Sequence, residues 1–148
     1  MFTYAGGAET LHALARTHYG RCVADPLLSR VFGTEPHPAH VDRLADWLGE
    51  VLGGPDRYTR LHGGHHALLR KHAGRGITEE ERQRFVEIFF ESADEVGLPP
   101  HPVFRKRLRE YIDWGTGIAL EVSYQATVGD TDEPVPVWGW GEAGPPVG

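Results

Sequence analysis

The segment of residues 58–85 constrains the fold of this chain most, because it places His72 between two helix signals. Residues 65–72 have the apolar spacing of a short helix, and glycines follow closely, as they often do just past a helix C-terminus. Thr78 and Glu81 then have the spacing of a capping box, which begins a longer amphipathic helix. The pattern predicts that His72 is the last side chain of the short helix and can present one ring nitrogen to a group bound in the core.

The other apolar residues also recur at helical spacing, and glycine or proline pairs separate the runs. Helices are expected over residues 9–24, 26–32, 39–52, 65–72, 78–96 and 102–122, with loops at 33–38 and 53–64. No segment alternates strictly between apolar and polar residues, as a half-buried strand does. The sequence therefore predicts an all-α fold, with a single domain over residues 1–123.

Composition excludes several classes of protein. The 148 residues carry a net charge of −6, so the chain lacks the basic surface with which proteins neutralise nucleic-acid phosphates. No apolar run approaches the roughly 20 residues of a membrane span, and the N-terminus lacks the basic and apolar blocks of a signal peptide. Cys22 is the only cysteine, which excludes an internal disulfide. These features predict a cytoplasmic protein without nucleic-acid or membrane partners.

Residues 124–148 form an irregular C-terminal extension that is rich in glycine, proline and acidic residues. Such a composition is typical of a solvated tail. However, the stretch Val135–Trp140 contains two tryptophans, which are unusual in a disordered tail of a soluble protein. Two alternatives therefore stay open: the extension is solvated, or Val135–Trp140 packs on the domain or on a partner chain.

Three motifs, GGPDRYT, LLRKHAGRGIT and RLREYIDWGTGIALEVS, resemble the truncated haemoglobins, in particular their second group. The resemblance covers residues 5–124, and it is the combination of motifs that is specific. It implies a globin-like fold, in which a two-over-two helical sandwich surrounds a haem pocket. It also implies haem b as the cofactor and a diatomic ligand (oxygen, nitric oxide or carbon monoxide) as the partner.

Residue by residue, the resemblance implies a ligand set on both faces of the haem. His72 matches the proximal histidine that ligates the iron, and Tyr19 matches the distal tyrosine. Phe32 matches an aromatic residue that wedges against the haem face. His40 falls at the distal gate, and Leu44 lies one turn further along the same helix.

The resemblance also implies how the haem edge is held. Arg43 and Lys71 match basic positions that commonly pair with haem propionates, and Tyr58 matches a tyrosine near the same edge. Phe85 departs from the pattern, because this group usually has tryptophan there. Phenylalanine cannot donate a hydrogen bond, so we expect bound oxygen to be held less strongly than in relatives with tryptophan.

The chemistry of haem independently favours these residues. Haem is flat and largely apolar, carries two carboxylates and needs an axial ligand for its iron. One ring nitrogen of His72 would bind the iron, and the other can donate to the Leu68 carbonyl one turn back, which would fix the tautomer. Tyr19 is the expected donor to a bound ligand, with His40 as the second donor. Both can act in acid–base chemistry, so these two are also the candidate catalytic residues.

Each of these side chains has a simpler interpretation. Tyr19 can be an ordinary core tyrosine, and Arg43 and Lys71 can be solvated charges. His40 can swing into solvent and gate the pocket without touching the ligand. Trp47 and Trp114 are expected only to pack, and Cys22 is expected to be a small buried apolar residue.

Three activities fit a haem protein of this kind. The first is storage, transport or sensing of a ligand, the second is nitric oxide dioxygenation, and the third is peroxidase-like chemistry. The last two need a separate reductase, because the chain has no dinucleotide-binding fingerprint. A non-haem metal site is an alternative, since His62, His65, His66 and His72 lie close together in sequence. A haem-free helical interaction domain is another. The sequence leaves a monomer and a homodimer equally open.

Overall fold

A computed structural model describes residues 1–35, 37–129 and 131–144 of the chain, and these residues form helices and irregular segments without a strand. Pro36, within the expected loop, and residues 130 and 145–148 of the extension lie outside the described part. The helices are α1 (Phe2–Ala5), α2 (Gly7–Ala24), α3 (Ser29–Phe32), α4 (Pro38–Val51), α5 (Arg57–His62), α6 (Gly64–His72), α7 (Glu79–Glu95) and α8 (Pro102–Ser123), followed by a 3₁₀ turn at Gly141–Ala143.

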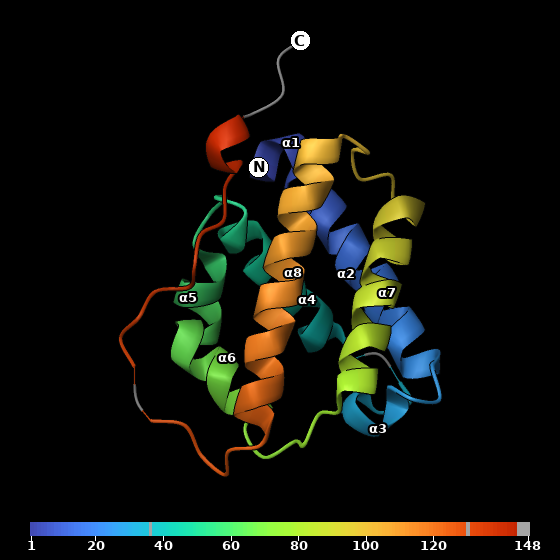
Figure 1. Cartoon of the computed structure of the whole chain (residues 1–148), viewed down its shortest axis with the longest axis vertical. Coiled ribbons are helices and arrows are strands. Elements are labelled where there is room, and N and C mark those ends of the chain that lie inside the picture. The colour runs from blue at the N-terminus through green and yellow to red at the C-terminus, as the bar shows by residue number, and fades with distance from the viewer. Residues whose placement is uncertain (36, 130, 145–148) are drawn as a thin grey trace.

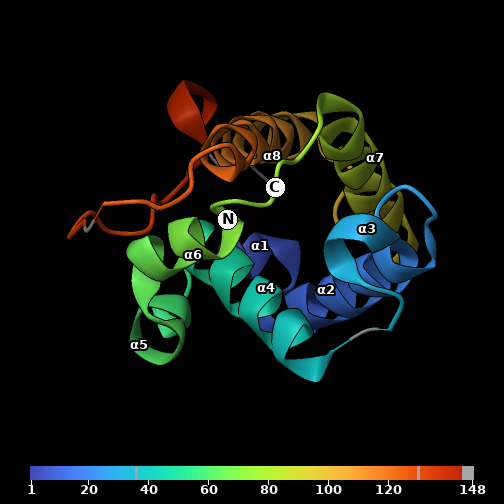
Figure 2. The same cartoon turned by 90° about the horizontal axis from the view of Figure 1, so that it is seen from below.

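The four long helices form two layers. Helices α2 and α4 pair in one layer, and α7 and α8 pair in the other (Figure 1). Viewed from below, α2 meets α7 at one side, while α5 and α6 lie at the opposite side and α6 packs on α8 (Figure 2). The all-α prediction and the two-over-two arrangement are therefore confirmed.

Local signals in the sequence account for the starts of the long helices. The Thr78 hydroxyl accepts from the Glu81 N–H at 3.1 Å, and the Thr78 N–H donates to the Glu81 carboxylate at 2.9 Å, so the expected capping box begins α7. Helices α4 and α8 both start with proline in their first turn, where its missing N–H costs nothing.

Several helix boundaries differ from the sequence prediction. The loop expected over residues 53–64 contains α5, and the helix expected from residue 26 is regular only over Ser29–Phe32. Tertiary contacts explain α5: the Glu50 carboxylate accepts from the Thr59 N–H at 2.8 Å, and Asp46 pairs with Arg57 at 2.8 Å. Both acids lie on α4, so the segment is ordered by a neighbouring helix that its own sequence does not reveal. Two smaller differences are that α1 was not expected and that α2 begins before residue 9.

After α8 the extension loops outward past α6 and α5, and its last part returns to the domain near the N-terminal end of α8 (Figure 1). Val135 is 2 % exposed and belongs to the main core, and the backbone N–H of Trp138 donates to the Val51 carbonyl at 2.7 Å. The guanidinium of Arg107 donates to the Gly139 carbonyl at 2.6 Å. The stretch Val135–Trp140 thus packs on the domain, as one of the two alternatives supposed.

An ion pair between Arg30 and Glu81 joins α3 to α7. The Glu81 side chain is 3 % exposed, and its carboxylate accepts from the Arg30 guanidinium at 2.6 and 2.8 Å. This hydrogen bonding lowers the pKa of Glu81 from 4.5 to about 2. A lowered folded-state pKa means that the pair stabilises the fold above the unfolded pKa and loses this contribution as the pH falls towards about 2.

We therefore expect Glu81→Gln to lower the free energy of unfolding by about 1 kcal/mol at neutral pH, since Arg30 is partly solvated. Glutamine keeps one acceptor oxygen for the Thr78 N–H, so the change removes the negative charge and one of the two hydrogen bonds from Arg30 but keeps the capping box. Urea unfolding of both proteins across acidic pH measures the effect. The difference should shrink as the pH falls through the range between 4.5 and about 2, and a pH-independent difference would contradict this account.

Within the described residues, no helix has both the length and the apolar character required to cross a membrane.

Candidate functional site

A cavity of about 430 Å³ lies inside the helical sandwich. Its lining includes every site residue singled out from the sequence, although these residues come from α2, α3, α4, α5, α6 and α7. They are Tyr19, Phe32, His40, Arg43, Leu44, Tyr58, Lys71, His72 and Phe85. A volume in this range suits a buried organic ligand or cofactor.

Four aromatic rings form one wall of the cavity. Tyr19 contacts Phe32 edge-on with 5.6 Å between ring centroids, and it lies 5.8 Å from the ring of His40. Phe85 stacks on Phe32 at 5.8 Å and 17°. Burial raises the pKa of Tyr19 to about 12, so its phenol keeps its proton at neutral pH and can donate a hydrogen bond.

His72 ends α6 and faces the same cavity. Its Nδ1–H donates to the Leu68 carbonyl at 2.8 Å, which confirms the expected hydrogen bond. Burial lowers the pKa of His72, so the imidazole is neutral. A carbonyl can only accept a hydrogen bond, so Nδ1 carries the proton. Nε2 therefore keeps a lone pair that can coordinate a metal ion.

Three cations lie at the rim of the cavity without a carboxylate partner in the described part of the chain. Arg43, Lys71 and Arg75 all line it, and none of the three is ion-paired among the residues that the structure describes. Burial, and then repulsion from Arg43, Arg70 and Arg75, lowers the pKa of Lys71. Like charges held together in this way favour binding of an anion, and two propionates on an apolar ring fit both the charges and the cavity.

Other cavity residues were missed or given no role from the sequence. Trp47, Tyr111, Trp114 and Pro136 line it, yet they come from α4, α8 and the extension, so only the tertiary structure brings them together. His65 also lines the cavity. A sequence signal for it existed, since His65 precedes His72 by two helical turns and so shares its face of α6.

His18 is a further buried histidine, which helical spacing places on the apolar face of α2 and to which the sequence assigned no role. It is completely buried, with its ring 4.4 Å from that of Phe85 and its Nε2 3.5 Å from the Cys22 sulfur. Burial lowers its pKa to about 3, so it is neutral. His18 does not line the cavity but packs behind the ring of Phe85. Cys22 is fully buried, as expected.

The histidine cluster on α5 and α6 does not form a metal site in the described part of the chain. No group of three or more histidine, cysteine or acidic side chains is placed there to hold an ion. His62 instead contacts the Asp46 carboxylate at 2.8 Å. This arrangement gives no support to the non-haem metal alternative.

The fold and the site together define a class of protein: a two-over-two helical globin, with a neutral histidine and a phenol lining one apolar cavity. Comparison with known proteins agrees, since residues 1–112 match the family of bacterial-like globins. The chain is 33% identical over 93 residues to the group 2 truncated hemoglobin YjbI of Bacillus subtilis, covering 62% of this chain and 68% of that protein. The chain therefore belongs to the group II truncated haemoglobins.

Solved structures give the same result. The thermostable hemoglobin of the actinobacterium Thermobifida fusca superposes with a TM-score of 0.71 at 30% identity, covering 83% of this chain and 98% of that one. The group II truncated hemoglobin of Bacillus anthracis superposes with a TM-score of 0.72 over 80% and 88% of the two chains. At 24% identity, the latter likeness supports the fold alone. Membership of this family implies a haem cofactor and binding of a diatomic ligand.

Proposed function

We propose that this protein binds haem b through Nε2 of His72 and holds oxygen, or another diatomic ligand, with Tyr19 and His40 as distal residues. The observation that carries the proposal is the 2.8 Å hydrogen bond from His72 Nδ1 to the Leu68 carbonyl. It orients the imidazole and leaves its one unprotonated nitrogen for the cavity. The iron of the bound haem supplies the coordination position at which a diatomic ligand binds.

The protein's own residues complete the site. Tyr19 presents a neutral phenol that can donate to the ligand, and His40 lies within ring contact of it. Leu44, Phe32 and Phe85 exclude water from this face, which strengthens any hydrogen bond made there. We assign no donor role to Phe85, because its side chain has none.

The rim residues hold the haem edge in this proposal. Arg43, Lys71 and Arg75 supply three positive charges for two propionates, and Tyr58 supplies a phenol whose pKa burial raises. Charge-assisted hydrogen bonds of this kind are worth about twice a neutral one.

Rim substitutions give a direct test of this assignment. Replacing Arg43 and Lys71 by glutamine should speed haem loss by about tenfold or more, since each hydrogen bond to a charged group contributes about 1.5–3 kcal/mol. Transfer of haem to an excess of apomyoglobin measures the rate. Arg70→Gln is the matched control, because Arg70 is exposed on the same helix and does not line the cavity. Equal rates for the control and the rim variant would contradict the assignment.

An absorption spectrum of the purified protein tests the function itself. A Soret band, and its shift on addition of carbon monoxide to the ferrous protein, is the expected result. Absence of the band after reconstitution with haem would overturn the proposal and favour the haem-free interaction domain. A haem-free spectrum together with stoichiometric zinc or iron would instead favour the non-haem metal alternative.

Within this proposal the protein carries, stores or senses oxygen, or it catalyses nitric oxide dioxygenation or peroxide reduction with a separate reductase. The sequence predicts a cytoplasmic location and leaves a monomer and a homodimer open. Analytical ultracentrifugation of the haem-loaded protein measures its oligomeric state.

A further inference from the structure

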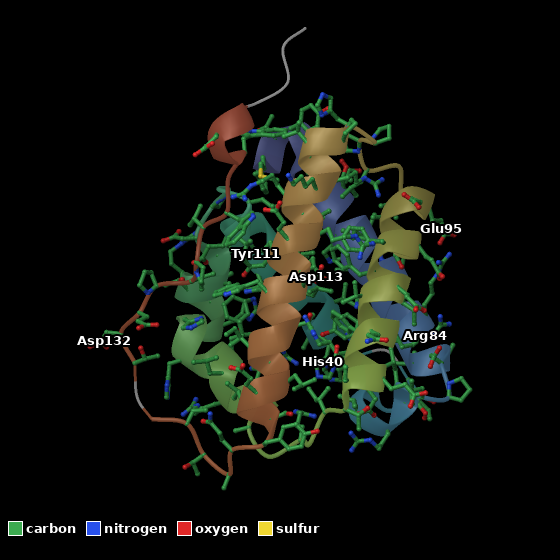
Figure 3. The ribbon with its side chains drawn as sticks, in the orientation of Figure 1. His40, Arg84, Glu95, Tyr111, Asp113 and Asp132 are labelled. Carbon is green, nitrogen blue, oxygen red and sulfur yellow. The ribbon has the colours of Figure 1, made fainter. Side chains whose placement is uncertain are left out.

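Four aromatic side chains connect the cavity to the protein surface. Trp47 on α4 lies 5.5 Å from Tyr111 on α8, and Tyr111 lies 5.9 Å from Trp114, measured between ring centroids. Trp138 of the extension lies 5.3 Å from Tyr111 and stacks on Trp114 at 6.0 Å and 24°. We call these four residues the aromatic chain. Tyr111 projects from α8 on the side that faces α4 and α5 (Figure 3).

The aromatic chain borders both the cavity and the solvent. Trp47, Tyr111 and Trp114 line the cavity in which the haem is proposed to lie. Trp114 is also 44 % exposed, so one indole reaches both the cavity and solvent. Ring contacts therefore connect the members of the aromatic chain from the cavity to the surface of the protein.

Packing alone does not explain the residue types in the aromatic chain. The indole N–H of Trp138, which does not line the cavity, is buried without a hydrogen-bond partner in the described structure. An unsatisfied buried donor costs about 1–3 kcal/mol, whereas phenylalanine would fill much of the same space without this penalty. Tryptophan and tyrosine differ from phenylalanine in one further respect, which is that they lose a single electron readily. Buried unsatisfied groups call for an explanation of this kind.

The surrounding charges indicate which member of the aromatic chain would carry the radical after loss of one electron. The Arg107 guanidinium lies 4.7 Å from the centre of the Trp138 ring, and it also pairs with Glu110. A cation over an indole face opposes positive charge on that ring. Among the described residues no cation lies over Trp114, and its exposure lets solvent take up the N–H proton. Trp114 is therefore the favoured terminal site.

We propose that the aromatic chain conducts electrons from the surface at Trp114 to the haem cavity, so that phenols too bulky to enter the cavity are oxidised at Trp114 with hydrogen peroxide as the oxidant. This inference rests on the proposed haem function. Each phenol loses one electron and one proton and becomes a phenoxyl radical. Two such losses break the O–O bond of one hydrogen peroxide molecule and convert it to two water molecules. Without a phenol, Trp114 itself loses the electron and its N–H proton.

The experiment treats the haem-loaded protein with hydrogen peroxide and a nitroso spin trap, which bonds covalently to carbon radicals. Peptide mass spectrometry then locates the trap. The expected result is an adduct on Trp114, none in the apoprotein, and loss of the adduct together with bulky-phenol oxidation in Trp114→Phe. Trp140→Phe is the matched control, because Trp140 packs on Tyr4 and Phe104 outside the aromatic chain.

The outcomes separate this inference from the proposed function. A missing Soret band overturns the haem assignment and the inference with it. A normal Soret band with no peroxide consumption, with adducts only on residues other than Trp114, or with undiminished phenol oxidation in Trp114→Phe overturns the inference alone. Circular dichroism of each variant confirms that the helices are intact.

Discussion

His72→Ala is expected to abolish stable haem binding, with haem loss accelerated by at least about a hundredfold. Changes to partners that merely orient a metal ligand already cost about 10–100-fold in affinity, and this change removes the ligand itself. The cavity of the variant keeps its apolar lining and its rim cations, so we expect it to take up haem only weakly and non-specifically. The Soret absorbance per protein after gel filtration, together with the pyridine haemochromogen content, measures the effect.

Two further variants make this test specific to the imidazole. His72→Gly should regain a Soret band when free imidazole is added, because imidazole can then fill the space of the missing side chain. His12→Ala is the control, since His12 lies outside the cavity and contacts Asp42 on the protein surface. If His72→Ala retains the pigment content and the spectrum of the parent, the proposed ligand is wrong.

Phe85→Trp is expected to slow oxygen dissociation by about ten- to a hundredfold. The substitution introduces an indole N–H at the cavity wall, and one hydrogen bond to a charged acceptor is worth about 1.5–3 kcal/mol. Stopped-flow replacement of oxygen by carbon monoxide measures the rate. Phe85→Leu is the control for changes in volume, because leucine also lacks a donor and should not slow dissociation.

The surroundings of Phe85 limit how the indole fits. The ring is stacked on Phe32 and meets the buried His18 edge-on at 4.4 Å. The larger side chain must displace one of these neighbours, and overpacking of this kind costs about 1–3 kcal/mol of stability. Phe85→Trp is therefore expected to lower the melting temperature while it slows oxygen release. An unchanged oxygen off-rate would refute the view that this position controls ligand retention by hydrogen bonding.

Local signals in the sequence were sufficient for the helical framework. The capping box of Thr78 and Glu81, the glycines after His72 and the helical spacing of apolar residues each act within one or two turns of chain. Such signals are written in neighbouring residues, so α2, α4, α7 and α8 could be predicted together with the position of His72 at a helix end. The hydrogen bond from His72 to Leu68 is equally local, since it joins residues four apart.

The list of candidate site residues came from the resemblance to a family, and all nine line one cavity. Their roles in holding haem and ligand remain proposals. The sequence also left Trp47 and Trp114 without a role, because nothing near them in the chain indicates a shared cavity. Helix α5 was missed for a similar reason: Asp46 and Glu50 of the neighbouring helix α4 order it.

What the sequence by itself determined is the all-helical fold, the approximate extent of the long helices, and an imidazole at the end of α6. These follow from short-range backbone hydrogen bonding and from the period of the apolar residues. Only the tertiary structure decided that Arg43, Lys71 and Arg75 share a rim without a carboxylate partner among the described residues, and that the extension brings Trp138 against Tyr111 and Trp114. The physical reason is that burial, charge pairing and ring contact depend on side chains far apart in the chain, whose distances are set when the two helical layers pack.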